Sequence, residues 1–319
     1  MKTAVIGLGV IGRVHLQVLA EMGREIVAVC DVDESKFAEY PNVASFVDYK
    51  QMIEEIRPDV VHVCTPHYLH AEMVVYALEK GVNVLCEKPL CISRGEIAQI
   101  LEAEKRSTAQ LGVVLQNRYN PANAYVKEQL GKDNATNGYA TMIWHRDEAY
   151  YAQAEWRGTK KMEGGGVLIN QALHTLDLLQ YFCGEPNQVV ASVSNLTLQN
   201  AIEVEDTASA LYSGKANFTF FATNGSQKDY MPEVMVYTKD GYMRVMGDYV
   251  LHNDELKHFN SRTRVYGKGC YGTGHGGLFA HFYGCIERGE KFPIDGTEGS
   301  KVIKMILAAY ESNGNTVDV

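Results

Sequence analysis

The chain has 319 residues, more than one ordinary hydrophobic core accommodates, so two domains are expected. Its hydrophobic fraction of 46% and charged fraction of 22% are typical of a globular protein and exclude extensive disorder. The formal net charge of -9 argues against a nucleic-acid partner, because binding to phosphates needs clustered Lys and Arg. No segment is apolar for long enough to span a bilayer, and the N-terminus does not fit a secretion signal, so we predict a cytoplasmic protein without a membrane partner.

The seven cysteines do not indicate a metal site. They include no close C-x-x-C pair, and Cys30, Cys64 and Cys86 fall at the ends of apolar runs. We interpret them as small buried hydrophobes in a reducing compartment. No pair of His, Cys or carboxylate residues has zinc-site spacing with a matching second pair, so no metal is expected.

Residues 1–118 alternate short β-branched runs with helical patterns. The first predicted strand, TAVIG, is followed by a helix over about residues 10–22. Further helical patterns separate the other strand-like runs, and strands that alternate with helices are typical of a doubly wound parallel sheet. The later strands are predicted in EIVAVC, DVVHVC, VNVLC and LGVVLQ.

Residues 119–319 have a different pattern. After a helix that begins with a proline, apolar and polar residues alternate with period 2, which predicts a mostly antiparallel sheet with one wetted face. The Asp240-Gly241 pair predicts a hairpin with a type I′ turn. We expect a loop over 258–277 and helices over about 278–288 and 297–312. The predicted strands lie in 139–147, 188–198, 207–213, 216–224 and 232–247.

A glycine-rich motif follows the first strand and opens the first helix. Glycines at its three fixed positions permit a tight turn, close approach of a pyrophosphate, and close packing of helix on strand. Asp31 ends the second strand, where a carboxylate binds ribose hydroxyls and repels a 2′-phosphate, so NAD is preferred over NADP. The alternative for Asp31 is a solvent-facing turn carboxylate. The expected cofactor-binding residues here are Gly7, Gly9, Val10, Ile11, Gly12 and Asp31.

Two further motifs complete a family pattern. Glu87-Lys88-Pro89 follows the run VNVLC, and Gly164-Gly165-Gly166 precedes Asn170, His174 and Asp177. With these motifs the chain resembles the Gfo/Idh/MocA oxidoreductases over nearly its full length. The resemblance implies a Rossmann dinucleotide-binding domain over 1–118, an α+β domain for substrate binding and oligomerisation over 119–319, and a homodimer or homotetramer formed through the open sheet. It also implies hydride transfer between NAD(P) and a secondary alcohol of a sugar, sugar derivative or cyclitol.

The chemistry of alcohol oxidation selects two residues. Removing the hydroxyl proton needs a group that titrates near neutrality, and His174 meets that need best; the alternative is that His174 is a core histidine packed on an apolar helix. Lys88 is expected at the carboxyl edge of the parallel sheet, where its ammonium can bind the alcohol oxygen; the alternative is a solvated loop lysine. We predict catalytic roles for both.

Asn170 is the third predicted catalytic residue. It lies four positions before His174, so on one helix it would share a face with His174, and Asp177 could reach the same face. Inositol dehydrogenase-like members have Asp at the position of Asn170, and Asn cannot supply that charge. The resemblance therefore makes inositol a less favoured substrate and gives Lys88 more of the proton transfer.

The resemblance also implies further residues along the nicotinamide half of the cofactor. They are Thr65, Pro66, His67, His70, Glu87, Lys88, Asn117, Trp156 and Arg157. His62 is interpreted as a buried, hydrogen-bonded imidazole without a role. Two aromatic groups either line a sugar pocket or pack at a subunit interface. They are His145, Arg146, Tyr150 and Tyr151, and Tyr266, Tyr271 and His275.

Two other functions fit the same motifs. One is a redox-neutral glycosidase that oxidises and re-reduces a sugar with NAD. The other is a non-catalytic dinucleotide-binding regulator, which Lys88 and His174 argue against.

Overall fold

The computed structural model describes residues 1–131, 135–259 and 272–319. The chain forms two compact units, one of Met1–Gln116 with Arg264–Ser300 and one of Asn117–Thr263 with Lys301–Val319. The expected single boundary after residue 118 differs from this division, since a late segment returns to the first unit. Within the described residues, no helix has the length and apolar character needed to cross a membrane.

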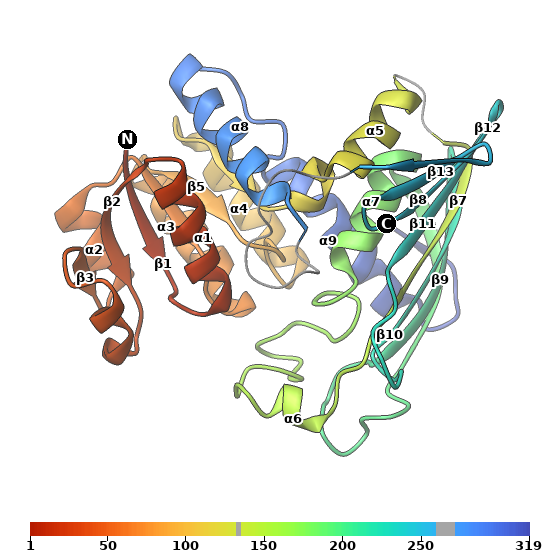
Figure 1. The fold of residues 1–319 in the computed structure, drawn as a ribbon. Helices are drawn as coiled ribbons and strands as arrows, with labels where there is room; N and C mark the ends of the chain where they lie inside the picture. The colour runs from red at the N-terminus through yellow and green to blue at the C-terminus, as the bar shows by residue number, and fades with distance from the viewer. Residues whose placement is uncertain (132–134, 260–271) are drawn as a thin grey trace. The chain divides into compact units, whose positions relative to one another are not determined.

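The first unit contains a six-stranded parallel sheet with the order β3-β2-β1-β4-β5-β6 (Figure 1). This confirms the predicted doubly wound sheet and adds one short strand, β3, which the sequence pattern did not predict. The order reverses between β1 and β4, and in such sheets ligands bind at the carboxyl ends of strands beside that reversal. The strands are β1 (Lys2–Ile6), β2 (Glu25–Cys30), β3 (Ala44–Phe46), β4 (Val60–Val63), β5 (Asn83–Cys86) and β6 (Leu111–Val113).

Helices connect these strands. Capping side chains mark several helix starts: the Asp48 carboxylate accepts from the Lys50 amide, and the Ser93 hydroxyl accepts from the Glu96 amide. The helices are α1 (Val10–Glu21), η1 (Glu34–Glu39), α2 (Tyr49–Ile56), η2 (His67–Leu69), α3 (His70–Glu79) and α4 (Arg94–Arg106).

Helix α8 (Gly274–Arg288) also belongs to the first unit. It begins four residues earlier than predicted, so Gly274–Gly277 is helical where a loop was expected; residues 260–271 of that predicted loop lie outside the described part. The helix buries Phe279, Phe282 and Tyr283 completely, and the Phe282 ring lies beside Gly112 of β6. Burial of these aromatic side chains explains why the segment packs with the parallel sheet.

The second unit is built on a nine-stranded mixed sheet with the order β14-β13-β12-β11-β7-β10-β9-β8-β15. Within this sheet, β10 and β7 are the only described neighbours that pair in parallel, so the predicted mostly antiparallel sheet is confirmed. The strands are β7 (Asn137–Ile143), β8 (Pro186–Ser194), β9 (Thr207–Gly214), β10 (Asn217–Thr223), β11 (Glu233–Thr238), β12 (Gly241–Met246), β13 (Tyr249–His252), β14 (Glu255–His258) and β15 (Val317–Asp318).

One face of this sheet is covered and the other is open. Helix α7 (Leu173–Cys183) packs against β7, β10 and β11 (Figure 1). Strands β8, β9 and β10 alternate buried and exposed residues, as their period-2 pattern predicted. The remaining helices associated with this unit are η3 (Gln116–Tyr119), α5 (Pro121–Leu130), α6 (Glu148–Tyr151) and α9 (Gly296–Ser312), which starts in the first unit.

The predicted hairpin exists, but its turn is shifted by one residue. Thr238 pairs with Gly241, so Lys239 and Asp240 form the turn, and only Gly241 has a positive φ, of 146°. The type I′ turn centred on Asp240-Gly241 was therefore wrong. A two-residue turn with positive φ at both positions occurs instead at Asn253 and Asp254, between β13 and β14.

Candidate functional site

The glycine loop lies at the carboxyl end of β1. Gly7 has a φ of 93°, and a Cβ on Gly12 would lie 1.8 Å from the Gly7 carbonyl oxygen. Both positions therefore need glycine. A Cβ on Gly9 would meet no described atom within 4 Å, so the loop leaves open space before the first turn of α1. This arrangement fits a phosphate group at the helix N-terminus.

Asp31 is buried at the end of β2. Its carboxylate accepts hydrogen bonds from the Leu8 amide at 2.7 Å and the Asp33 amide at 2.9 Å, so it also supports the glycine loop. The Lys36 ammonium contacts both of its oxygens at 3.0 Å. Asp31 is therefore not an isolated solvent-facing carboxylate, and Lys36 reduces the negative charge that would repel a 2′-phosphate.

The loop after β4 is tied to the loop after β5 by His70. Its two ring nitrogens lie 2.8 Å from the Thr65 carbonyl oxygen and 2.7 Å from the Pro89 carbonyl oxygen. A neutral imidazole donates to only one of them, and burial lowers the pKa of His70. The position of His70 supports a role in holding both loops, while His67 is also buried, with its ring 6.1 Å from that of His70.

Glu87 and Lys88 follow β5 at the same edge of the sheet. Lys88 is half-buried, and its backbone amide donates to Glu87 Oε2 at 3.0 Å. Glu87 Oε1 lies 3.0 Å from Nε2 of the buried His15. Burial raises the pKa of Glu87, whereas the Lys88 ammonium and the Lys88 backbone amide lower it. His62, predicted to be buried and hydrogen-bonded, is both.

In the second unit, Asn170 and His174 stand out by exposure. They are the only residues between Val167 and Gln180 that are not buried. This argues against packing of His174 in the core. Asn170 is not on the helix, however, since α7 begins at Leu173 and the Asn170 amide donates to the Gly166 carbonyl in the preceding turn. The predicted shared helix face was therefore wrong, because the triple glycine leads into a turn rather than directly into a helix.

Two buried carboxylates that the sequence analysis missed support this turn. Glu163 accepts hydrogen bonds from the Gly158 amide and the Asn170 side-chain amide. Burial raises the pKa of Glu163 from 4.5 to about 7. Glu205 accepts from the amides of Gly166 and Leu168 at 2.8 and 3.0 Å. An acidic residue directly before the triple glycine was the available sequence signal.

Asp177 has a structural contact instead of the expected one near His174. Its buried carboxylate binds the Arg118 guanidinium through two hydrogen bonds of 2.8 and 2.6 Å. This bidentate pair joins η3 to α7. The prediction that Asp177 reaches a shared face with His174 is replaced by this contact.

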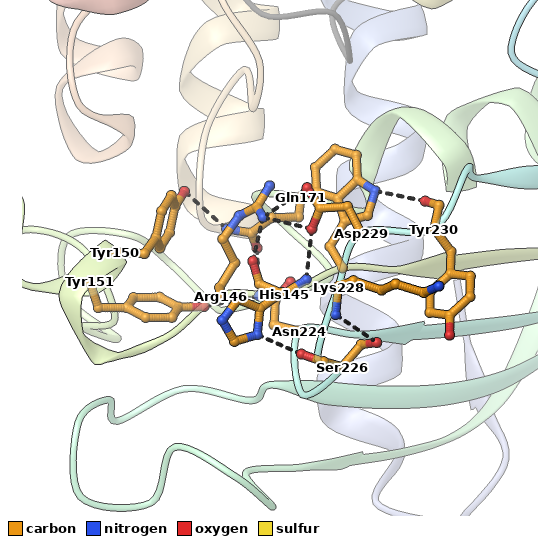
Figure 2. A network of polar contacts seen from close by, with 11 residues as sticks. His145, Arg146, Tyr150, Tyr151, Gln171, Asn224, Ser226, Lys228, Asp229 and Tyr230 are labelled. Atoms are coloured by element: carbon orange, nitrogen blue, oxygen red, sulfur yellow. Dashed lines mark hydrogen bonds and ion pairs between the residues drawn. The ribbon is translucent and has the colours of Figure 1, made fainter.

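The residues around α6 form a polar and aromatic network, shown in Figure 2. The Gln171 side-chain amide donates to the Tyr150 hydroxyl, and Asn224 donates to the hydroxyl of Tyr151 and to Gln171. Arg146 joins this network because its backbone amide donates to the Asn224 carbonyl at 3.0 Å. The His145 amide and the Arg146 guanidinium both bind the Asp229 carboxylate.

The remaining expected cofactor residues of the second unit lie in two places. The Arg157 guanidinium lies 4.4 Å from the Tyr150 ring and 5.2 Å from the Trp156 ring, at the edge of the α6 network. Asn117 lies in η3, where its carbonyl accepts from Asn123 at 2.8 Å.

The other aromatic group is not assembled as expected. His275 is fully buried in the first unit, with its ring 6.3 Å from that of His15, so it lines neither a sugar pocket nor an exposed interface of the second unit. Tyr266 and Tyr271 lie outside the described residues. Within the described ranges, no cluster of three or more His, Cys, Asp or Glu could hold a metal ion.

Two family models match successive parts of the chain. Residues 1–115 match the model of the oxidoreductase family with an NAD-binding Rossmann fold, and residues 134–244 match the GFO/IDH/MocA C-terminal domain. Together they cover more than half of the chain. The chain belongs to the Gfo/Idh/MocA family. The motifs Glu87-Lys88-Pro89 and Gly164-Gly165-Gly166, on which the resemblance rested, thus occur in a member of this family.

Curated proteins similar to this chain include sugar dehydrogenases. D-glucoside 3-dehydrogenase of Escherichia coli is 32% identical over 58% of this chain and 55% of its own length. D-apiose dehydrogenase of Paraburkholderia graminis is 23% identical over 100% of this chain and 89% of its own length. The chain spans 45% to 62% of the length of the first curated relatives it matches.

Solved structures show the same fold. The WlbA dehydrogenase of Chromobacterium violaceum, in complex with NADH and UDP-GlcNAcA, superposes with a TM-score of 0.87. It is 25% identical, and the match covers 100% of this chain and 96% of that one.

Proposed function

We propose that the protein is an NAD-dependent oxidoreductase that transfers a hydride between the nicotinamide and a secondary alcohol of a sugar, sugar derivative or cyclitol. The observation that carries the proposal is the exposure of Asn170 and His174 within an otherwise buried segment. A histidine that combines access to a ligand with a fixed backbone suits proton transfer. Membership in an oxidoreductase family supports the same chemistry.

The first unit fits a dinucleotide. The open space at Gly9, the N-terminus of α1 and the Asp31 carboxylate are the groups we propose for the pyrophosphate and the adenosine ribose. Thr65, Pro66 and His67 lie at the end of β4, and Glu87 and Lys88 at the end of β5, where the nicotinamide half is proposed to bind. A bound NAD supplies the hydride acceptor. Trp156, Arg157 and Asn117 stay proposed contacts.

The proton chemistry is assigned to three side chains. We propose that Lys88 Nζ binds the alcohol oxygen and stabilises negative charge on it, that His174 accepts the hydroxyl proton, and that Asn170 orients the substrate. Glu163 acts on Asn170, because its carboxylate accepts from the Asn170 side-chain amide. This hydrogen bond fixes the orientation of the Asn170 side-chain amide.

Carbohydrate is the substrate class that the relatives favour. D-glucoside 3-dehydrogenase and D-apiose dehydrogenase are named for sugars, and the WlbA structure contains a UDP-sugar. The α6 network supplies aromatic rings and hydrogen-bonding groups that suit a sugar. The tyrosines Tyr150 and Tyr151 are therefore proposed to contribute to the substrate pocket.

We also propose that the open face of the nine-stranded sheet joins two copies of the chain. Val190, Leu211 and Phe221 project from neighbouring strands with 37%, 47% and 36% exposure. Val190 pairs with Leu211, so their side chains form one continuous apolar area with Phe221 of β10. Such an area is typical of a permanent interface.

A substrate panel tests the proposal. Full-length protein would be incubated with NAD or NADP and with aldoses, polyols, cyclitols and nucleotide sugars, while reduced nicotinamide and products are measured. Accumulation of reduced nicotinamide with an oxidised product supports the dehydrogenase. Glycoside cleavage without net reduction indicates a redox-neutral glycosidase, and NAD binding without any conversion indicates a regulator.

A further inference from the structure

A chain of five buried polar side chains crosses the core of the first unit. It runs from Glu87 Oε1 to His15 Nε2 at 3.0 Å, and from His15 Nδ1 to His62 Nδ1 at 2.8 Å. It continues from His62 Nε2 to the Tyr283 hydroxyl and from that hydroxyl to Thr3 Oγ1, both at 2.9 Å. Thr3, His15, His62 and Tyr283 are 0% exposed, and Glu87 is 5% exposed.

The hydrogen-bonding capacity of these groups gives the chain a direction. If Glu87 is ionised, His15 carries its proton on Nε2 and donates to the carboxylate. His15 Nδ1 then accepts from His62 Nδ1–H, and His62 Nε2 accepts from the Tyr283 hydroxyl. The Tyr283 oxygen in turn accepts from the Thr3 hydroxyl. Every N–H and O–H hydrogen of these side chains then has an acceptor.

The opposite direction is less favourable. A protonated Glu87 would donate to His15 Nε2, both histidines would exchange tautomers, and Tyr283 would donate to Thr3. The Thr3 hydroxyl hydrogen would then need another acceptor, and the contacts of the described residues provide Thr3 Oγ1 with none besides Tyr283. A buried donor left unsatisfied costs about 1 to 3 kcal/mol.

We propose a hydrogen-bond chain with a single donor direction, from Thr3 through Tyr283, His62 and His15 to Glu87. This chain keeps Glu87 ionised and thereby positions Lys88. The link to Lys88 is its backbone amide, which donates to the second carboxylate oxygen of Glu87. His15 and His62 are thus positioning residues rather than catalytic ones. The positioning role in this inference rests on the proposed function of Lys88. The tautomers expected for His15 and His62 do not depend on it.

Burial keeps the two histidines of the chain neutral, as this direction requires. Burial lowers the pKa of His15 to about 3 and that of His62 well below its usual value, so both imidazoles are neutral. Burial raises the pKa of Glu87 and so opposes its ionisation, whereas the Lys88 ammonium and the Lys88 backbone amide favour it. The titratable groups that face Glu87 are His15 of α1, His70 of α3, His275 of α8, Lys88 beside it, and the thiols of Cys64 and Cys86.

Nitrogen NMR of the full-length protein labelled with ¹⁵N-histidine tests the tautomers. Single His15→Gln and His62→Gln variants would assign the two rings. We expect both rings to be neutral at neutral pH, with the proton of His15 on Nε2 and that of His62 on Nδ1. The reverse pair of tautomers, or a doubly protonated His15, would overturn the inference without reference to any activity.

Two tyrosine variants test the positioning role. Tyr283→Phe removes the donor to His62, and Tyr212→Phe is the matched control, since Tyr212 is buried in the second unit and its hydroxyl donates to the Met305 carbonyl. We expect Tyr283→Phe to shift the His62 tautomer and to move the acidic limb of kcat/KM to higher pH, while Tyr212→Phe does neither. An unmoved acidic limb would overturn the positioning role. If no substrate is turned over by the wild-type protein, the proposed function fails while the tautomers still decide the direction of the chain.

Discussion

The side-chain amide of Asn170 donates a hydrogen bond to Glu163 Oε1, which places a buried carboxylate next to a residue proposed to orient the substrate. The Gly158 amide donates to the other carboxylate oxygen. An Asp at position 170 would carry a negative charge that Asn170 lacks. Glu163, the hydrogen-bond partner of Asn170, supplies such a charge when it is ionised. Because the pKa of Glu163 is raised to about 7, this charge varies in the neutral pH range.

Glu163 should make the stability of the protein depend on pH. Its pKa is raised from 4.5 to about 7 by burial, so the folded state favours the protonated form. The contribution of Glu163 to the free energy of unfolding is fully present below pH 4.5. It is lost as the pH rises through about 7, and the loss is on the order of 3 kcal/mol. Glu163→Gln should remove this slope from the free energy of unfolding. Glu155→Gln, at an exposed position of the same unit, should keep it; equal slopes in both variants would refute the assignment.

Asn170→Asp should change the pH profile of turnover. A second carboxylate at this position would lie against Glu163, and like charges at such a distance raise the pKa of at least one of them. A negative charge four residues before His174 in the sequence would also favour its protonated form. We expect the acidic limb of kcat/KM to move to higher pH in Asn170→Asp and to stay in place in the uncharged control Asn170→Ser. A shift of equal size in both variants would mean that charge is not the cause.

Asp31 and Lys36 should together set the cofactor preference. Lys36 contacts both oxygens of Asp31, so removing the carboxylate frees an ammonium that can bind a 2′-phosphate. Asp31→Ser should shift the ratio of the Kd values for NAD and NADP by about tenfold toward NADP, or ~1.4 kcal/mol. Titrations of both cofactors measure this ratio. Glu34→Gln is the control, since Glu34 is an exposed carboxylate of the same segment, and an unchanged ratio in Asp31→Ser would exclude Asp31 as the ribose ligand.

A charge on the open sheet face should dissociate the oligomer. Leu211 lies in the middle of the exposed apolar area, opposite Val190 on one side and Thr219 on the other. Burying an unpaired guanidinium there would be costly, so Leu211→Arg should give monomers in light-scattering measurements. Val32→Arg, at a position 89% exposed in the first unit, should leave the assembly unchanged. A wild-type monomer, or an intact Leu211→Arg oligomer, would contradict the proposed interface.

Local patterns predicted the parallel sheet and its glycine loop, because strand, turn and helix N-terminus are adjacent in sequence. Long-range packing set the features that were missed. The path of α8 back to the first unit depends on burying Phe279 and Phe282, and the turn at Lys239 and Asp240 depends on the pairing of Tyr237 with Tyr242. Neither contact leaves a local signal.

The candidate site shows the same division. Lys88 at the end of β5 was expected there, since a strand end is a local feature. The turn at Asn170 and the carboxylates of Glu163 and Glu205 required knowledge of which backbone amides the tertiary fold leaves to be satisfied. Sequence spacing alone favoured a continuous helix.

The most direct test of the proposed function compares Lys88→Met with Lys105→Met, an exposed lysine of the same unit, on the best substrate of the panel. We predict that Lys88→Met keeps its fold and still binds NAD but loses about 10²- to 10⁴-fold in kcat, while Lys105→Met is unchanged. Wild-type rates in Lys88→Met would contradict the dehydrogenase mechanism proposed for this protein.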